Sequence, residues 1–561
     1  MHYAYLFEAR GIQRFLFASG KLKDMQGGSE LLDYVCADGG LLDQVLEKLN
    51  LSPGKPRNAG GVFYLLFENQ QDARRFQAVW RMACANWIPG IEQVDTLSQG
   101  QTAKEAIDNG HGQLRTQRNQ LIVDLPRPGP LSERSPRTGL AAVKNIKGES
   151  LDVATAKQRV FERTDTEASL AQRFLNEANV FWPTDFEESA PKDRRFPLDE
   201  RRLVGLIHAD GNGLGELLRV LNTACQDAED KTYIQLYKTF SDGLTDATLG
   251  AAREASKAVL LPEAVDIGHG NRLLPARPLV LGGDDLTIVT RADLALPYTE
   301  KFLKAFEQYS HISMDKLRSA FETAGLADAA RQLPKNLTAC AGISYMKCSQ
   351  PFLAGHELAE GLCKRAKDAS RKARTSDQAL MPSSVAFHKV QDSLLDDAKS
   401  QFDKDNRVNH QNESWQLALP VYGIHADSKL PALDALNGLV NLFAKARNNR
   451  SGNLHFNDRP LRELVTLWRD NPELAKKAYG RWYELADRNN EQDLQAFDDF
   501  MTQLIRQTRR DLPCSSTVGE DGAYSSPISD LLHLLTIRRS AQPQRQPATQ
   551  IEPAETAEVS A

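Results

Sequence analysis

The chain has 561 residues, of which 25 % are charged and 41 % belong to the hydrophobic set, and its formal net charge is −5. These proportions exclude a collagenous, largely disordered or membrane-embedded protein over most of the length. The negative balance gives no overall attraction to nucleic acid, so any RNA contact would depend on local basic patches.

The seven cysteines are scattered and form no CxxC pair, which predicts reduced thiols rather than a redox or zinc motif. The sequence contains no run of about 18 apolar residues, so it predicts no membrane span. We therefore expect a cytoplasmic protein without a membrane partner, divided into about three or four domains.

The first expected unit, residues 1–125, follows an order of strand, helices, hairpin, helix, strand and helix. Apolar periodicity and turn residues indicate these elements. They are a strand at 3–7, helices to about 50, a hairpin in which Gly60-Gly61 precedes VFYLLFE, a helix at 70–87, a strand near Val94 and a helix from about Thr102.

A second unit, residues 201–395, repeats this order. Its expected elements are a strand at 203–207, helices to about 259, the hairpin PLVLGGDDLTIVT, a helix at 298–321, the strand LTACAGISYM and a helix at 353–372. The repeat favours an α+β fold with two copies of one ferredoxin-like βαββαβ domain. The alternative is a chance similarity between two ordinary α/β segments.

The remaining sequence divides into three parts. Residues 126–200 begin with the Pro/Gly/Ser-rich stretch PRPGPLSERSPRTG and form an expected helical linker region. Residues 396–540 form an expected C-terminal helical domain, with a strand-like WQLALPVYGI and periodic patterns at 433–446, 461–485 and 494–505. Residues 541–561 lack apolar periodicity and are expected to be disordered.

The strongest chemical signal is a set of three carboxylates from two separated stretches. Asp210 lies in IHADGNGLG, and Asp284 and Asp285 lie in LGGDDLTIV, both at predicted strand ends. In a ferredoxin-like sheet the first strand lies beside the central hairpin, so these carboxylates would meet. Because adjacent carboxylates repel one another, a pair of Mg²⁺ or Mn²⁺ ions is the expected ligand, as in two-metal phosphoryl transfer.

Glycines beside these carboxylates suit the approach of a triphosphate. Gly282 and Gly283 allow a positive φ and remove side chains at the hairpin, while Gly211, Gly213 and Gly215 leave backbone amides free where a helix begins. Gly211, Asn212 and Gly213 are therefore expected to bind the nucleotide. Either motif alone is a common turn, and the joint placement in one domain favours a phosphate site.

Two further side-chain types lie near this site in the predicted domain. Lys364 and Lys367 stand off the apolar side of the helix at 353–372 and suit a triphosphate tail, although a solvated basic face explains them equally well. His208, next to the catalytic strand residues, is expected to pack rather than to bind metal. The absence of an HD dipeptide gives no support to an HD-type nuclease.

These motifs resemble the large polymerase/cyclase subunit of type III CRISPR effector complexes, in a variant without an HD domain. The resembling stretches are ARGIQRFLFASGKLKDMQGGSELL, AGGVFYLLFE, IHADGNGLG, GGDD, CAGISYMKCSQPFLAGHELAEGLCKRAKDASRK and SSVAFHKV. The resemblance implies a degenerate first palm domain and a catalytic second palm domain. It also implies synthesis of cyclic oligonucleotides, expected to be cyclic oligoadenylate, from ATP in antiviral defence.

The resemblance assigns roles to individual positions. Asp210, Asp284 and Asp285 become the metal ligands, and Gly282 and Gly283 the wall beneath the triphosphate. Gly27, Gly28 and Ser29 would help to hold a second nucleotide between the palms. The expected partners are CRISPR RNA complex subunits and target RNA.

Two departures from the family limit the resemblance, and two other functions stay open. The chain starts at the palm, so DNA cleavage is not expected, and SERSPRTGLAAV carries no cysteine where relatives have a zinc module, so no zinc is expected. The alternatives are a non-catalytic scaffold subunit of an RNA-guided complex and a cyclic-dinucleotide synthase.

Overall fold

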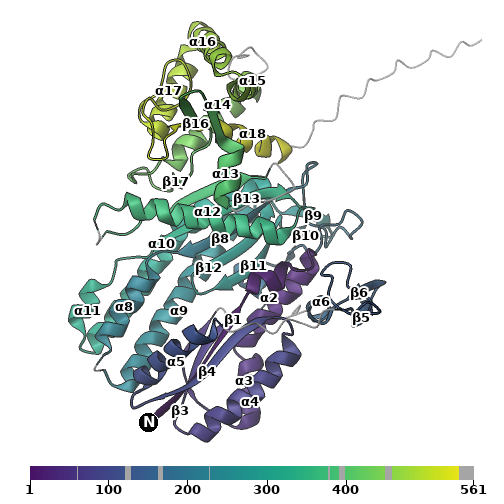
Figure 1. Ribbon diagram of the computed structural model, residues 1–561, viewed down its shortest axis with the longest axis vertical. Coiled ribbons are helices and arrows are strands. Elements are labelled where there is room, and N and C mark those ends of the chain that lie inside the picture. The colour runs from purple at the N-terminus through teal and green to yellow at the C-terminus, as the bar shows by residue number, and fades with distance from the viewer. Residues whose placement is uncertain are drawn as a thin grey trace, which may run out of the picture.

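The computed structural model describes residues 1–59, 61–119, 128–161, 169–226, 228–376, 379–390, 398–448 and 458–541. The chain is a mixed α+β protein. A four-stranded sheet near the N-terminus, a six-stranded sheet in the middle and a mainly helical C-terminal part follow one another along its longest axis (Figure 1). All but the first residue of the expected tail at 541–561, and Gly60 of the first hairpin, lie outside the described residues.

The N-terminal sheet has the strand order β2-β3-β1-β4, with antiparallel neighbours. Its elements are β1 (His2–Arg10), α1 (Ile12–Phe17), α2 (Leu22–Cys36), α3 (Leu41–Leu49), β2 (Gly54–Ala59), β3 (Val62–Phe67), α4 (Gln70–Trp87), β4 (Glu92–Gly100) and α5 (Ala103–Gln117). The Asn69 side chain accepts a hydrogen bond from the Gln71 amide and so fixes the start of α4.

The six-stranded sheet has the order β11-β12-β8-β13-β14-β17. Its elements are β8 (Leu203–Gly211), α8 (Leu214–Ala224), α9 (Asp230–Ala255), η1 (Ser256–Leu260), β11 (Ala276–Gly282), β12 (Asp285–Arg291), α10 (Ala292–Thr323), α11 (Ala327–Gln332), β13 (Ala339–Lys347), α12 (Phe352–Ala373), β14 (Ser384–Lys389) and β17 (Tyr422–Gly423). Its first four strands repeat the order of the N-terminal sheet, as the repeated element order in the sequence predicts.

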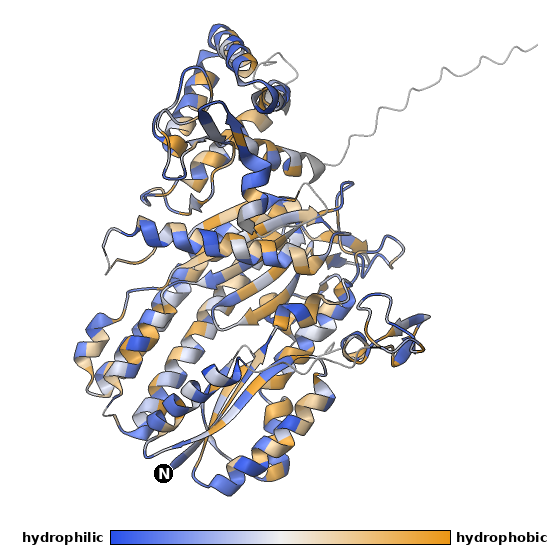
Figure 2. Cartoon of the chain, in the orientation of Figure 1, coloured by the Kyte–Doolittle hydropathy of each residue, from blue (hydrophilic) through white to orange (hydrophobic). Residues whose placement is uncertain are grey.

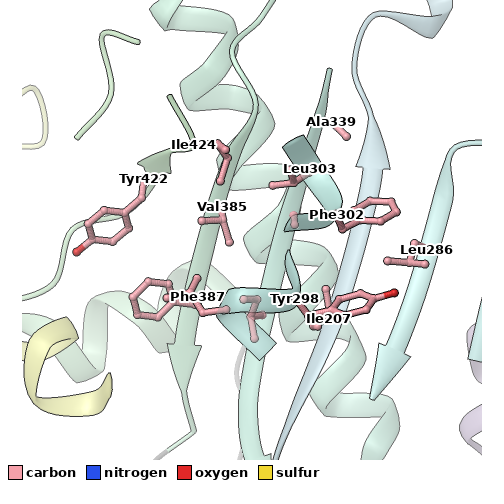
Figure 3. Packing of buried hydrophobic residues seen from close by; sticks show 14 of the residues in the cluster. Ile207, Leu286, Tyr298, Phe302, Leu303, Ala339, Val385, Phe387, Tyr422 and Ile424 are labelled. Atoms are coloured by element: carbon pink, nitrogen blue, oxygen red, sulfur yellow. The ribbon is translucent and has the colours of Figure 1, made fainter. Parts of the chain in front are cut away.

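The two faces of the six-stranded sheet are covered by different helices. Alternation along β8 directs Ile207 toward Tyr298 and Phe302 of α10 (Figure 3). Hydrophobic residues are concentrated along the strands of the six-stranded sheet (Figure 2). On the other face α12 lies directly on β13. Gly342 of β13 allows this close approach because it has no side chain, and a Cβ there would come 1.9 Å from the Ala359 carbonyl oxygen of α12. Helix α12 is thereby fixed over β13, the neighbour of the strand β8 that carries Asp210.

A small module joins the two sheets. It contains β5 (Lys144–Ile146), β6 (Glu149–Leu151), α6 (Val153–Val160) and α7 (Leu170–Phe174), and a further small sheet is formed by β7 (Val180–Phe181), β10 (Asn271–Leu273) and β9 (Val265–Gly268). Burial opposes the ionisation of Glu149, but hydrogen bonds from Arg137, Arg159 and Lys21 lower its pKa to about 2. Arg159 also pairs with the buried Asp24 of α2, which ties the module to the N-terminal unit.

The C-terminal part contains α13 (Ala398–Asn406), β15 (Arg407–His410), β16 (Glu413–Gln416), α14 (Leu433–Asn448), α15 (Asp458–Asp470), α16 (Pro472–Asn489), α17 (Glu491–Ile505), β18 (Tyr524–Ser525) and α18 (Ile528–Ala541). The prediction of one helix over 461–485 is wrong, because Asn471 ends α15 and its side chain caps α16, which Pro472 begins.

The expected single strand WQLALPVYGI is also wrong. It is divided between β16 and β17, which belong to different sheets, and Pro420 lies between them without an amide N–H for a ladder. In the part of the chain that the structure describes, no helix combines the length and apolar character needed to cross a bilayer.

Candidate active site

Three carboxylates meet at one end of neighbouring strands β8 and β12. Leu286 pairs with Ala209, so the next residues along the two strands, Asp285 and Asp210, lie side by side. Gly282 pairs with Asp285 across the turn formed by residues 283 and 284, and Gly283 has a φ of 60°. A positive φ at the first turn position alone fits a type II′ hairpin, in which glycine is favoured.

The turn brings Asp284 back over β8. A Cβ at Gly211 would come 2.9 Å from the Asp284 Cβ, so the glycine after Asp210 makes room for the Asp284 side chain. Asp284 and Asp210 are joined by a side-chain hydrogen bond. The structure therefore brings the three predicted acidic residues together.

Burial and the neighbouring negative charges disfavour the charged forms of Asp284 and Asp285. The pKa of Asp284 is raised well above its usual value, first by burial and then by the hydrogen bond and charge of Asp210. Burial, followed by the charges of Asp210 and Glu360, raises the pKa of Asp285 to about 8. Within the described part of the chain, the buried Oδ1 of Asp285 accepts no hydrogen bond.

The nearest cation lies on α12. The Nζ atom of Lys367 is 2.5 Å from Asp210 Oδ2 and 2.8 Å from the Gly211 carbonyl oxygen. Although burial opposes the ammonium form, Asp210 raises the pKa of Lys367. Lys367 does not separate Asp210 from Asp284, because the side chains of these two residues are hydrogen-bonded to each other. Lys364, three residues earlier on the same helix, lines the same cavity as Lys367.

The carboxylates lie between two cavities. The first, which we call the inter-unit cavity, has a volume of about 680 Å³ and is lined by both sheets and their helices, including Ser29, Gly61, Gly282, Gly283 and Asp285. The second, which we call the C-terminal cavity, has a volume of about 1490 Å³ and lies between α12 and the C-terminal part. It is lined by His208, Asp210, Lys364 and Lys367, among others.

The three residues predicted to hold a second nucleotide have different surroundings in α2. A Cβ at Gly27 would lie 1.8 Å from the Gln158 carbonyl oxygen, and one at Gly28 would lie 3.0 Å from Gln158 Nε2. These glycines allow α2 to pack against α6 and do not line the inter-unit cavity. Ser29 does line it, and its hydroxyl donates to the Leu279 carbonyl oxygen of β11.

The predicted phosphate-binding residues after Asp210 are held by the fold. The Asn212 amide donates to the Thr338 carbonyl oxygen over 2.8 Å, and Asn212 Nδ2 donates to Thr338 Oγ1 over 3.0 Å. Its side chain is thus engaged with the residue preceding β13. Gly213 has a φ of 76° and precedes the first residue of α8, a conformation that glycine adopts without strain.

Several polar residues of the inter-unit cavity escaped the sequence analysis. Lys238, Asp242 and Asp246 line it from α9 and Arg173 from α7. Thr248 Oγ1 donates to the Gly283 carbonyl oxygen over 2.6 Å and so supports the hairpin turn. The spacing of four between Lys238, Asp242 and Asp246 marks one helix face. Only knowledge of which face meets the hairpin could have singled them out.

In the described ranges, no three His, Cys, Asp or Glu side chains already form a group that could hold a metal ion. The three carboxylates nevertheless offer oxygen ligands, which Mg²⁺ and Mn²⁺ prefer. Together with the unsatisfied Asp285 oxygen, this donor set fits a divalent cation once the side chains adjust around it.

The fold is similar to that of CRISPR effector subunits. A chain of the crystal structure of a Csm1–Csm4 cassette in complex with cA4 has 13 % sequence identity and a TM-score of 0.50, covering 96 % of this chain and 70 % of that one. A chain of a cassette in complex with AMPPNP has 13 % sequence identity and a TM-score of 0.47, covering 96 % of this chain and 69 % of that one. A chain of a Csm1–Csm4 subcomplex in the type III-A CRISPR–Csm interference complex has 12 % sequence identity and a TM-score of 0.41, covering 95 % of this chain and 70 % of that one.

The similarity in fold confirms the resemblance to type III CRISPR effector subunits that the motifs indicated. No protein-family model matches the chain, and no curated protein matches it.

Proposed function

We propose that the chain is a metal-dependent nucleotidyltransferase that joins nucleoside triphosphates, with ATP as the expected substrate, into cyclic oligonucleotides such as cyclic oligoadenylate. The observation that carries the proposal is the meeting of Asp210, Asp284 and Asp285 between two cavities, one of which both sheets line. The proposed parts are a first palm domain at 1–125, a linker region at 126–200, a catalytic palm domain at 201–395 and a helical domain at 396–540.

The three carboxylates are the proposed ligands of Mg²⁺ or Mn²⁺. The raised pKa values of Asp284 and Asp285 mean that these two carboxylates lack sufficient countercharge as anions, and a divalent cation would supply it. When bound, a pair of such ions stabilises the attacking and the leaving oxygen of a phosphoryl transfer.

The chain's own residues divide the remaining tasks. Lys364 and Lys367 border the C-terminal cavity and would offer positive charge to the triphosphate tail. Gly282 and Gly283 border the inter-unit cavity beside Asp285 without side chains that would block a phosphate. A volume of about 680 Å³ is in the usual range of small-molecule sites, and Ser29 lies on its N-terminal side, where a second nucleotide would bind.

The proposed setting is antiviral defence in the cytoplasm. The similarity of fold to chains of Csm1–Csm4 cassettes supports a place beside another protein subunit in a CRISPR RNA complex. Target RNA is the proposed activating partner. Ligands in those crystal structures, such as cA4, agree in class with the proposed product.

The test compares the wild type with an Asp284→Ala/Asp285→Ala variant. Each is incubated with labelled ATP or GTP and Mn²⁺, and products are identified by mass spectrometry, alone and with partner subunits and target RNA. The matched control is Asp328→Ala, which removes a carboxylate that is 92 % exposed. We expect cyclic products from the wild type and the control only. Equal products from all three proteins would contradict the proposed site.

One observation favours the scaffold alternative. Lys367 already neutralises Asp210, so the fold holds part of the site together without metal. A scaffold would assemble with its partner subunits and make no product under any of these conditions. A cyclic-dinucleotide synthase would give products of two nucleotides only, which mass spectrometry distinguishes from larger rings. The inter-unit cavity within a single chain favours the leading proposal over an obligate homodimer of dinucleotide synthases.

A further inference from the structure

The buried imidazole of His208 faces the acidic cluster. His208 and Asp210 lie on the same face of β8 because side chains alternate along a strand. His208 pairs in register with Thr287 of β12, and Asp285 is the diagonal neighbour on the same face. The Nδ1 atom of His208 lies 3.3 Å from Asp285 Oδ1 and 3.3 Å from Thr287 Oγ1.

The imidazole of His208 is packed by its neighbours. Its ring meets the edge of the His356 ring on α12, with centroids 5.2 Å apart. His356 in turn lies 5.2 Å from the Phe17 ring of α1. The His208 side chain is 8 % exposed. The ring therefore has little freedom to turn away from Asp285.

The chemistry of the contact fixes which nitrogen carries the proton. A neutral imidazole carries one N–H, and its other ring nitrogen can only accept a hydrogen bond. The hydroxyl of Thr287 can donate or accept, but the ionised Asp285 carboxylate, which is the form that would bind a cation, can only accept. A proton on Nδ1 suits both neighbours, whereas a bare Nδ1 would repel Asp285 Oδ1.

We propose that His208 is a positioning residue whose Nδ1–H orients Asp285 for binding a divalent cation. The inference rests on the proposed function, because it concerns the same metal site. The Asp285 Oδ1 atom is buried and accepts no hydrogen bond of good geometry from the described residues. Groups that hold metal-ligating side chains in place change metal affinity by about 10- to 100-fold when they are lost.

Two substitutions distinguish the role of the Nδ1–H donor of His208 from the role of its ring in packing. His208→Asn retains an N–H donor close to the position of Nδ1 but loses the ring. His208→Phe retains a ring of similar size against His356 but loses both nitrogens. His356→Phe is the matched control, because it keeps the ring packing between His208 and Phe17 and removes nitrogens that have no hydrogen-bond partner among the described residues.

The experiment measures Mn²⁺ binding to the full chain from the loss of the free-ion signal in electron paramagnetic resonance. Thermal unfolding of each variant checks that it is folded. We expect His208→Phe to bind Mn²⁺ at least about 10-fold more weakly, while His208→Asn and His356→Phe stay within about threefold of wild type.

The outcomes distinguish this inference from the proposed function. Wild-type affinity in His208→Phe, or equal weakening in His208→Asn and His208→Phe, would overturn the positioning role and leave the metal site intact. If the wild type bound no more Mn²⁺ than Asp284→Ala/Asp285→Ala, the proposed metal site itself would fail, and the positioning role with it.

Discussion

Replacing Asp285 with asparagine should stabilise the metal-free protein at alkaline pH. In the folded chain, burial and then the charges of Asp210 and Glu360 raise the pKa of Asp285 from 3.8 to about 8. Between about pH 4 and pH 8 the folded state therefore holds a proton that the unfolded state has released. Stability falls as the pH rises through this window and stays low above it. Asparagine has no carboxyl group to ionise and avoids this loss.

The size of the effect follows from the pKa difference. A difference of about 4 at ~1.4 kcal/mol for each pKa unit sets a ceiling of ~6 kcal/mol. The Asp285 side chain is 31 % exposed, and solvent screens a charge that it can reach, so we expect about 2 kcal/mol.

Thermal unfolding in EDTA at pH 5 and pH 9 measures this difference. For a unit of about 200 residues, 2 kcal/mol corresponds to a rise in Tm of about 4–8 °C at pH 9. At pH 5, only about one unit above the ordinary pKa of 3.8, little of this loss has occurred, so the two proteins should unfold at similar temperatures. Asp328→Asn, at a position 92 % exposed, should change neither value. An Asp285→Asn protein less stable than wild type at pH 9 would refute the reasoning.

Three further predictions concern the surroundings of the site. Gly27→Ala should lower the free energy of unfolding by about 3 kcal/mol in chemical denaturation, because its Cβ would lie 1.8 Å from a carbonyl oxygen of α6. Gly215→Ala, with nothing within 4 Å, should raise it by about 0.5–1 kcal/mol, and equal effects of the two would contradict the packing argument. Lys367→Gln removes a charge that lowers the pKa of Asp285, so the midpoint of Mn²⁺ binding in a pH titration should move to higher pH, and an unchanged midpoint would count against it. Thr248→Val removes the 2.6 Å hydrogen bond to the hairpin turn and should cost about 1 kcal/mol of stability and slow product formation relative to wild type, whereas an unchanged rate would show that this bond does not support the site.

Local patterns were sufficient for most of the two sheets. The apolar run VFYLLF became β3, and the helix expected at 70–87 has those bounds because Asn69 caps it. The hairpin around GGDD followed from turn chemistry, since Gly283 takes the positive φ that a two-residue turn needs. In these elements, residues near one another in sequence determine the conformation.

Contacts between distant segments were beyond the sequence analysis. Nothing near Gly27 in the sequence indicates that α6, about 130 residues later, packs against it. The ion pair between Lys367 and Asp210 joins residues 157 positions apart. The Asn471-Pro472 pair, in contrast, is a local signal for a helix start that could have divided the expected helix at 461–485.

The two repeats offer an internal comparison for the acidic cluster. Ala59 pairs with Val62 across the first hairpin turn as Gly282 pairs with Asp285 across the second, so Val62 stands where the second unit has Asp285. Val62 pairs in turn with Glu8 of β1, the counterpart of Asp210.

In the first unit this carboxylate is neutralised. Arg118 donates to both oxygens of Glu8, with a shortest distance of 2.6 Å. The same strand arrangement thus occurs twice. In the first unit Glu8 is paired with Arg118 and lies beside Val62, and in the second unit three carboxylates meet, of which Asp210 contacts Lys367. A strand end of this fold does not require the acidic cluster for stability, since the first unit forms the same strand order without it. The excess negative charge of the second unit therefore points to a ligand that carries positive charge.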